Sequence, residues 1–285
     1  MQALRLVTTW PVRHAAGAVV APDGRVHTVG DIDHGFRLAS LAKMFVGWTA
    51  LVAAEEGTLD LDEPLSSIGG HAVDGCTPRH LLAHAGGFAF DSFERIAAPG
   101  ARRIYSNTGI DLFAELLADR TGMPFADYQR EALFEPLGMS ATELRGSPAK
   151  DVHSSVRDMV AFLHELRTPT LISPATAAQF ATVQFAGLAG TVPGIGRFDD
   201  CPWGLGTEIR GGKRPHWTGH RNSSATYGHF GGAGTLLWVD PVAMTSCVVL
   251  TDRPFDDWAA EALRRWSELA DEVLAECASA DAGAE

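Results

Sequence analysis

Cysteine is scarce in this chain of 285 residues. The four that occur are far apart and form no Cys-x-x-Cys pair: Cys76, Cys201, Cys247 and Cys277. That spacing is not typical of a zinc site, and it does not provide the framework of a disulfide-stabilised domain. We therefore expect no metal, no cofactor and no structural disulfides, and the simplest compartment is a reducing cytosol.

Basic residues are also in deficit. The chain has 23 lysines and arginines against 35 acidic residues, a net charge of −12 and a pI near 5.3. Nucleic acids and anionic lipids are bound by basic surfaces. This balance therefore argues against nucleic acid and membrane surfaces as partners.

Long hydrophobic runs are missing as well. The most apolar stretch, Met44 to Ala54, is too short and too interrupted to span a bilayer. The first ten residues contain no basic segment followed by a long apolar core, so they do not have the form of a secretory signal. We expect a cytoplasmic protein, and the sequence does not predict its oligomeric state.

The remaining composition is that of a soluble globular domain. Hydrophobic residues make up 46% and charged residues 20%, and the length suffices to bury a sizeable core. Two short apolar runs flank Pro22-Asp23-Gly24, and Asp-Gly between such runs predicts a β-hairpin. Apolar residues at helical spacing then predict a helix from Leu41 to Glu56 that ends at Gly57.

The middle of the chain is predicted to be mostly helical, and strands return late. Helices are expected over 108–122, around 156–166 and from Ser173, strands over 203–209, 234–239 and 245–251, and a last helix over 256–276 followed by a frayed tail. The Gly-rich segment 185–196 is expected to be a mobile loop. The predicted fold class is α/β (α+β): an antiparallel β-sheet flanked by helices (1–57 and 194–285) plus a mostly helical subdomain (58–193), in one domain.

Ser40-Leu41-Ala42-Lys43 is the first of three segments that carry chemistry. A serine and a lysine three apart on a helix share one face, with Cβ atoms about 5–6 Å apart. A serine hydroxyl is a poor nucleophile until a neighbouring base, such as an unprotonated lysine, takes its proton. Alone, this pattern is most often a solvated helix face.

The second and third segments are Tyr105-Ser106-Asn107, before a helix, and His229-Phe230-Gly231-Gly232, at the start of a late strand. A phenol with a lowered pKa can serve as a general base, and an asparagine can hold a lysine or a substrate amide. Glycine lets the backbone approach a ligand, and a free N–H there can contact an oxyanion. Taken singly, these residues would be ordinary packing and turn residues.

In this order the three segments resemble the serine β-lactamase and penicillin-binding-protein superfamily, and within it the class C β-lactamase-like serine hydrolases of esterase type. The similarity extends over about residues 15 to 255. The similar segments are 36–43, 59–65, 80–84, 104–109 and 135–139.

The resemblance implies a catalytic role for several residues of the first two segments. Ser40 would be the acylated nucleophile, and Lys43 would take or relay its proton. Tyr105 would be the partner base and would protonate the leaving group, while Asn107 would position Lys43 and the substrate. The implied reaction is a two-step acyl transfer.

The third segment indicates which classes of substrate are expected. The backbone N–H groups of Ser40 and Gly232 would form the oxyanion hole, with Gly231 beside them. His229 occupies a position that is lysine in many relatives, and a histidine is mostly neutral near pH 7. This weakens the case for a substrate carboxylate, and so for β-lactams or D-Ala peptides.

Three functions therefore remain open. The first choice is a carboxylesterase or acyl hydrolase acting on small esters or amides. The alternative within the same chemistry is a β-lactamase or D-Ala-D-Ala carboxypeptidase, and an alternative of another class is a non-catalytic binding protein that kept the cleft.

Other residues have weaker signals. The basic segment 210–217 is either a solvated loop or, by hypothesis, a cleft rim that recruits an anionic or acyl-carrier-bound substrate through Lys213 and Arg214. Trp217, Asn222 and Tyr227 are candidate pocket residues. His80 and His84 have a spacing that zinc ligands can have, but no glutamate follows His80 as His-Glu-x-x-His would need, so His84 is expected to be structural.

Overall fold

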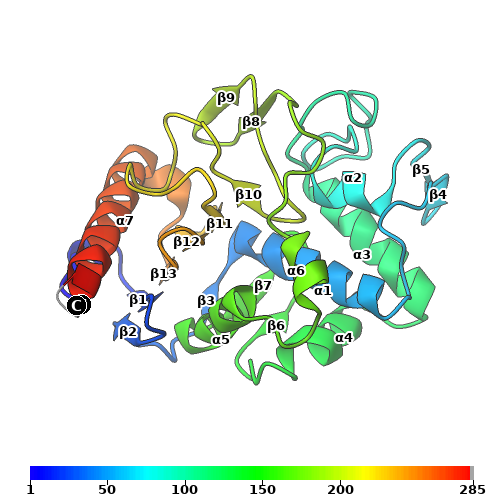
Figure 1. Cartoon of the computed structure of the whole chain (residues 1–285). Coiled ribbons are helices and arrows are strands. Elements are labelled where there is room, and N and C mark those ends of the chain that lie inside the picture. The colour runs from blue at the N-terminus through cyan, green and yellow to red at the C-terminus, as the bar shows by residue number, and fades with distance from the viewer. Residues whose placement is uncertain (283–285) are drawn as a thin grey trace.

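A six-stranded antiparallel sheet forms the centre of the fold (Figure 1), in a computed structural model that describes residues 1–282. The strand order is β10-β11-β12-β13-β1-β2. The strands are β1 (Ala15–Val20), β2 (Val26–Val29), β10 (Glu208–Ile209), β11 (Tyr227–Gly231), β12 (Thr235–Asp240) and β13 (Thr245–Thr251). The first strand pairs with the last, Ala15 lying opposite Thr251, so the chain ends meet in one sheet as predicted.

Helices cover both faces of this sheet. Alternation along β13 sends Val248 and Leu250 into one core, with α1 (Ala42–Glu55) and α5 (Val156–Arg167), and sends Cys247 and Val249 into the other, with α7 (Ala259–Ala282). In Figure 1, α7 lies on one side of the sheet, and α1 and α5 lie on the other. A strand covered on both faces reads as a continuous apolar run, which explains why β13 was predicted to its exact ends.

The remaining elements are short apart from α3. The helices are α2 (Pro78–Leu82), α3 (Asn107–Thr121), α4 (Phe125–Gln129) and α6 (Pro174–Ala178), with helical turns η1 (Ala3–Thr9), η2 (Ala39–Leu41), η3 (Arg130–Phe134) and η4 (Phe255–Asp257). The small strands are β3 (Phe36–Arg37), β4 (Ser67–Ile68), β5 (His71–Ala72), β6 (Glu143–Leu144), β7 (Val152–Ser154), β8 (Gly190–Val192) and β9 (Gly196–Phe198). The boundaries of the helical subdomain at 58 and 193 stay a prediction.

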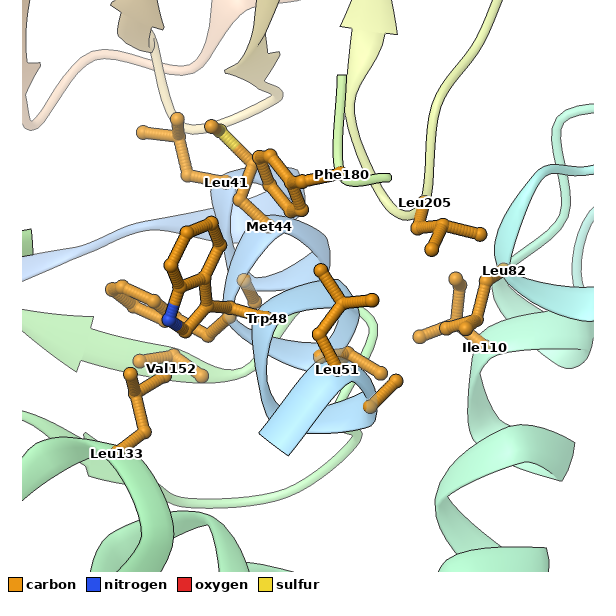
Figure 2. Close-up of a cluster of buried hydrophobic side chains, with 14 of the residues drawn as sticks. Leu41, Met44, Trp48, Leu51, Leu82, Ile110, Leu133, Val152, Phe180 and Leu205 are labelled. Atoms are coloured by element: carbon orange, nitrogen blue, oxygen red, sulfur yellow. The ribbon is translucent and has the colours of Figure 1, made fainter. Parts of the chain in front are cut away.

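Helix α1 is the buried axis of the larger core. Twelve of its fourteen residues are buried, and side chains from several other elements surround it (Figure 2). The Trp48 indole packs edge-on against Phe162 of α5 and Phe180. A helix enclosed in this way is held by packing on all sides. Its first turn, which carries Lys43, is therefore fixed in place.

Three predicted elements differ from the structure. The strand expected over 203–209 is reduced to Glu208–Ile209, because residues 204–206 turn beneath α1: a Cβ at Gly206 would lie 2.2 Å from the Lys43 carbonyl oxygen. The last helix begins at Ala259, after the turn η4, and continues to Ala282, so the tail expected to fray is helical that far. Residues 283–285 of that tail lie outside the described residues. The segment 185–196 contributes β8 and the start of a hairpin with β9.

None of the helices that the structure describes combines the length and the apolar composition that a bilayer crossing needs.

The glycine inside α1 yields a test of this packing. Replacing a helical glycine by alanine usually stabilises a helix by up to about 1 kcal/mol. At Gly47, however, the new Cβ would lie 2.0 Å from the Leu205 carbonyl oxygen. We expect Gly47→Ala to lower the free energy of unfolding by about 1–3 kcal/mol, measured by urea denaturation.

Gly109 in α3 is the matched control, because its nearest neighbour would be the Leu81 carbonyl oxygen at 3.4 Å, an ordinary contact. Gly109→Ala should leave stability unchanged or raise it slightly. Equal effects of the two substitutions would contradict the described packing of α1.

Candidate active site

Ser40 lies in a tight turn that leads into α1. The turn is η2, and Ala39 immediately before Ser40 has a φ of +50°, a left-handed conformation that a non-glycine residue seldom adopts. Its neighbour Leu38 is held by the sheet, because its carbonyl accepts a hydrogen bond from the Thr235 hydroxyl at 2.8 Å. Gly231 allows this approach, since a Cβ there would lie 2.3 Å from the same carbonyl oxygen. The turn is therefore held by β11, through the close approach at Gly231, and by β12, through Thr235.

Lys43 is buried one helical turn after Ser40. Its Nζ lies 3.1 Å from the Ser40 Oγ, 2.7 Å from the Asn107 Oδ1 and 2.9 Å from the Ala149 carbonyl oxygen. The Ser-x-x-Lys spacing thus brings the amine and the hydroxyl together as the sequence predicts. Ala149 is a third neighbour that the sequence did not indicate, because a main-chain carbonyl leaves no mark on residue type.

Burial changes the proton affinity of this amine. Desolvation lowers the pKa of Lys43 from 10.5 to about 7, and the carboxylates of Asp111 and Asp91 oppose that shift. Near neutral pH a substantial fraction of Lys43 is therefore an uncharged amine, which can accept a proton.

Two acidic residues support the Lys43 site from a distance. Asn107 joins one of them, since its Nδ2 donates to the Asp91 Oδ1 at 2.8 Å. Asp111 accepts hydrogen bonds from the Ser147 hydroxyl at 2.7 Å and from the Ala149 N–H at 3.2 Å, and so it fixes the peptide segment that contacts Lys43. Sequence reasoning missed both acids, although Asp111 lies one helical turn after Asn107, a spacing that could have indicated it.

Tyr105 and His229 line the same pocket as Ser40. The Tyr105 hydroxyl lies 3.4 Å from the His229 Nε2, and the His229 Nδ1 lies 2.6 Å from the Phe230 carbonyl oxygen. A carbonyl only accepts, so Nδ1 must carry the hydrogen, and the Nε2 of the neutral ring accepts from the phenol. Burial lowers the pKa of His229 to about 3, so this ring is neutral at physiological pH.

The pKa of Tyr105 does not follow the expected direction. A phenolic base would need a lowered pKa, but burial raises the pKa of Tyr105 well above 10, and a hydrogen bond with Ser40 offsets only part of that shift. The phenol is therefore protonated in the resting protein.

His84 packs against the Tyr105 ring, with ring centroids 4.6 Å apart, and accepts a hydrogen bond from the Ser106 N–H at 3.2 Å.

A pocket of about 200 Å³ opens over Ser40. Tyr105, His229 and Gly232 line it, and a Cβ at Gly232 would meet open space. The other lining residues come from the loop before α3, the β8–β9 hairpin, the segment 203–208, β11 and η4: Phe90, Val192, Pro193, Gly194, Trp203, Glu208, Phe230, Phe255 and Asp256. Of the predicted catalytic residues, Ser40, Tyr105 and His229 line this pocket. Lys43 and Asn107 do not line it, but the Lys43 Nζ is within hydrogen-bond distance of both Ser40 and Asn107.

Two predicted substrate-binding residues are placed elsewhere. Trp217 is buried behind the pocket wall and donates from its Nε1 to Glu208 at 2.7 Å. Asn222 is buried in its own loop, where its Oδ1 accepts from the Gly219 N–H at 2.8 Å. Neither is among the residues that line the pocket.

The basic segment after β10 also differs from its hypothesised role. Lys213 is only 2% exposed and pairs with the buried carboxylate of Glu208 at 3.1 Å. His216 contacts the same carboxylate at 3.3 Å. Lys213 is therefore not available to a substrate, and that part of the cleft-rim hypothesis is wrong.

Comparison with known proteins agrees with this fold. A model of the Beta-lactamase family matches residues 11–271. A crystal structure of a β-lactamase from Mycobacterium bovis is 45% identical, with a TM-score of 0.91, and the match covers 96% of this chain and 99% of that one. EstCE1, described as a hydrolase with promiscuous acyltransferase activity, shares the fold at 18% identity and a TM-score of 0.76, over 96% of both chains.

Curated relatives are longer than this chain. A putative D-alanyl-D-alanine carboxypeptidase of Escherichia coli K12 is 25% identical in an alignment of 251 positions that covers 70% of this chain and 58% of that protein. Penicillin-binding protein 4* of Bacillus subtilis is 27% identical over 49% of this chain and 37% of its own length. Fold and matches define a protein of the serine β-lactamase and penicillin-binding-protein superfamily. Within it, the chain belongs to the Beta-lactamase family.

The charges around Lys43 predict opposite shifts in a pH profile. Acylation of Ser40 by a p-nitrophenyl ester should rise with pH through about 7, as Lys43 loses its proton. Asp91 raises the pKa of Lys43 and Lys150 lowers it. We therefore expect Asp91→Asn to move the inflection to lower pH and Lys150→Gln to move it to higher pH.

Stopped-flow measurement of the acylation rate from pH 5 to pH 10 tests this. Both side chains are partly exposed, so the two shifts should shrink at 1 M salt. Shifts of the same sign, or an inflection in the wild type near 10, would contradict the environment described for Lys43.

Proposed function

We propose that this protein is a serine hydrolase that forms an acyl-enzyme on Ser40, and that its substrates are small carboxylic esters or amides. The observation that best supports this proposal is the set of three neighbours around the Lys43 Nζ. An uncharged amine has two hydrogens and one lone pair. In the uncharged amine, the carbonyl oxygens of Asn107 and Ala149 can accept the two hydrogens, which would leave the lone pair to accept the proton of the Ser40 hydroxyl.

The proposed first step is proton transfer coupled to attack. Ser40 Oγ forms a bond to the substrate carbonyl carbon while its proton passes to the Lys43 Nζ. The carbonyl oxygen becomes an oxyanion, which the backbone N–H groups of Ser40 and Gly232 would stabilise. The N-terminal end of α1 adds a favourable dipole at that point.

The leaving group then needs a proton. Tyr105 supplies one, since its raised pKa keeps the phenol protonated and it borders the pocket beside Ser40. The Lys43 Nζ lies 4.8 Å from the centroid of the Tyr105 ring, so a water molecule could pass the proton taken from Ser40 from the Lys43 ammonium to the Tyr105 phenolate. Water deacylates Ser40 by the same path in reverse, which completes the hydrolysis.

Two features of the pocket support small esters or amides over β-lactams. A volume of about 200 Å³ at Ser40 accommodates a short group around the reacting carbonyl. The third segment supplies a neutral imidazole at His229, whose pKa of about 3 leaves it without charge, so it offers a substrate carboxylate no cation.

A β-lactamase or D-Ala-D-Ala carboxypeptidase is the second candidate. It is supported by the names of the relatives, which are described as β-lactamase, penicillin-binding protein and D-alanyl-D-alanine carboxypeptidase. The cytoplasmic location inferred from the sequence stays a prediction.

A substrate panel separates these candidates. Wild type and Ser40→Ala are assayed with p-nitrophenyl acetate and butyrate, a chromogenic cephalosporin and a D-Ala-D-Ala peptide. We expect turnover of the esters to exceed that of the other two substrates, and to fall by roughly 10³-fold or more in Ser40→Ala.

Each other outcome identifies an alternative. Ester turnover that survives Ser40→Ala would remove the nucleophile assignment. Preferential turnover of the cephalosporin or the peptide would favour the second candidate. The absence of both turnover and a fluorophosphonate adduct on Ser40 would indicate a binding protein that kept the cleft.

Replacing the phenol tests its role as a proton donor. Tyr105→Phe should lower kcat/KM for esters with an alkyl alcohol as leaving group by about 10²–10⁴-fold. The loss should be smaller for the p-nitrophenyl esters, because p-nitrophenolate can leave without a proton. The inflection near pH 7 should remain, because it belongs to Lys43. If the inflection disappears in Tyr105→Phe, then Tyr105 itself is the titrating base, and the assignment of that role to Lys43 is wrong.

A further inference from the structure

A second pocket of about 440 Å³ adjoins the pocket over Ser40. The two pockets share three wall residues, namely Phe90, Tyr105 and Pro193. The second pocket, here called the arginine pocket, is further lined by Ile96, Arg102, Arg103, Ile104, Ala189, Gly190, Thr191 and Arg197. Because the first pocket is small, a substrate larger than its reacting group must extend beyond it.

Main-chain pairing builds the arginine pocket from two distant segments. The Arg103 N–H donates to the Ala189 carbonyl at 2.8 Å, and Arg103 forms a parallel bridge with Gly190. A Cβ at Gly190 would lie 2.5 Å from the Arg103 Cβ, so glycine is required for this approach. Arg197 lies opposite Thr191 in the β8–β9 hairpin, and residues opposite each other share a face of a hairpin.

The wall of this pocket is strongly cationic for an acidic protein. Three of its residues are arginines, and none is acidic. Arg103 is buried, and its guanidinium donates only to main-chain carbonyls in the part of the chain that the structure describes: those of Ala83, Gln184, Phe185 and Cys201. Among the described residues no carboxylate forms a salt bridge with Arg103, although the charge of Asp200 raises the pKa of its guanidinium. An anion that approached this buried cation would stabilise it further.

The two other arginines are exposed and face solvent. Arg102 makes one long hydrogen bond, to the Ile96 carbonyl at 3.3 Å, and Arg197 is exposed on its hairpin. A guanidinium is suited to a carboxylate, which it can bind through two parallel hydrogen bonds. The pocket therefore offers two accessible cations beside one that is buried.

Apolar side chains lie next to these cations. Phe90 is 51% exposed and Ile96 is 43% exposed, although large apolar side chains are usually buried. Both line the arginine pocket, and Phe90 also borders the pocket over Ser40. An apolar linker between a reacting carbonyl and an anion would cover this surface.

We propose that the arginine pocket is a substrate subsite for a carboxylate, and that Arg102 and Arg197 contact this group while the ester or amide carbonyl lies at Ser40. The substrate would be a small ester or amide with an apolar linker and an acidic end. This inference rests on the proposed function. It also places anion recognition away from His229 and Lys213.

Matched ester pairs test the subsite. One pair carries the anion on the acyl part: the p-nitrophenyl monoester of glutaric acid and its methyl ester. The other carries it on the leaving group: 4-acetoxybenzoate and its methyl ester. We expect wild type to prefer the acid in at least one pair, and Arg102→Gln/Arg197→Gln to lower the acid-to-ester ratio of kcat/KM by about tenfold.

Controls separate a charge effect from a general loss of activity. Arg264→Gln, which removes an exposed arginine from α7, should leave the ratio unchanged. Arg102→Glu/Arg197→Glu should lower the ratio further. If a double variant is unstable, Arg197→Gln alone and the wild type at 1 M salt should each lower the ratio.

The failure of this inference differs from the failure of the proposed function. The subsite is wrong if the acid-to-ester ratio of kcat/KM is near one in both pairs, or if the arginine variants and salt do not lower it. In that case, turnover that depends on Ser40 would still support the proposed function. If Ser40→Ala hydrolyses the neutral esters as fast as wild type, the proposed function itself is wrong.

Discussion

The burial of one lysine amine is the constraint on which the rest of the site depends. Lys43 is enclosed by the core around α1, and its pKa is lowered to about 7. An unfolded chain would hold this proton up to about pH 10.5, so between pH 7 and 10.5 the unfolded state binds more protons than the native state. The free energy of unfolding therefore rises with pH across this window, and the group costs stability at neutral pH. The architecture around α1 tolerates that cost because two carbonyl oxygens satisfy the amine.

The sheet and the helical part each fix part of the surroundings of Ser40. The sheet holds the turn before Ser40 through Thr235 and the close approach at Gly231. The helical part supplies Asn107 at the start of α3 and the segment around Ala149, which Asp111 holds. Tyr105 and His229 come from these two parts and meet over the pocket. The candidate catalytic groups thus lie where segments distant in sequence converge.

Much of the fold and of the candidate site could be predicted from the sequence, because short motifs encode local geometry. Ser40 and Lys43 are one helical turn apart, so their spacing in the sequence predicts that they are close in space. The strand β13 could be predicted because its residues form an apolar run. Residues that act across the fold were not predictable in the same way: the carbonyl of Ala149 has no signature in the sequence. Trp217 and Asn222 have residue types suited to a pocket, but the fold buries them in internal hydrogen bonds. The raised pKa of Tyr105 depends on burial that no local pattern reveals.

The protonation state of Lys43 is the central claim, and it can be observed directly. The chain contains three lysines, Lys43, Lys150 and Lys213, so a protein labelled with ¹³C at the lysine ε-carbon gives a simple spectrum. Lys43→Arg assigns the signal, because arginine is not labelled. The account predicts that this resonance titrates near pH 7 in the resting protein. A titration near pH 10.5, the value of an unperturbed lysine, would contradict it.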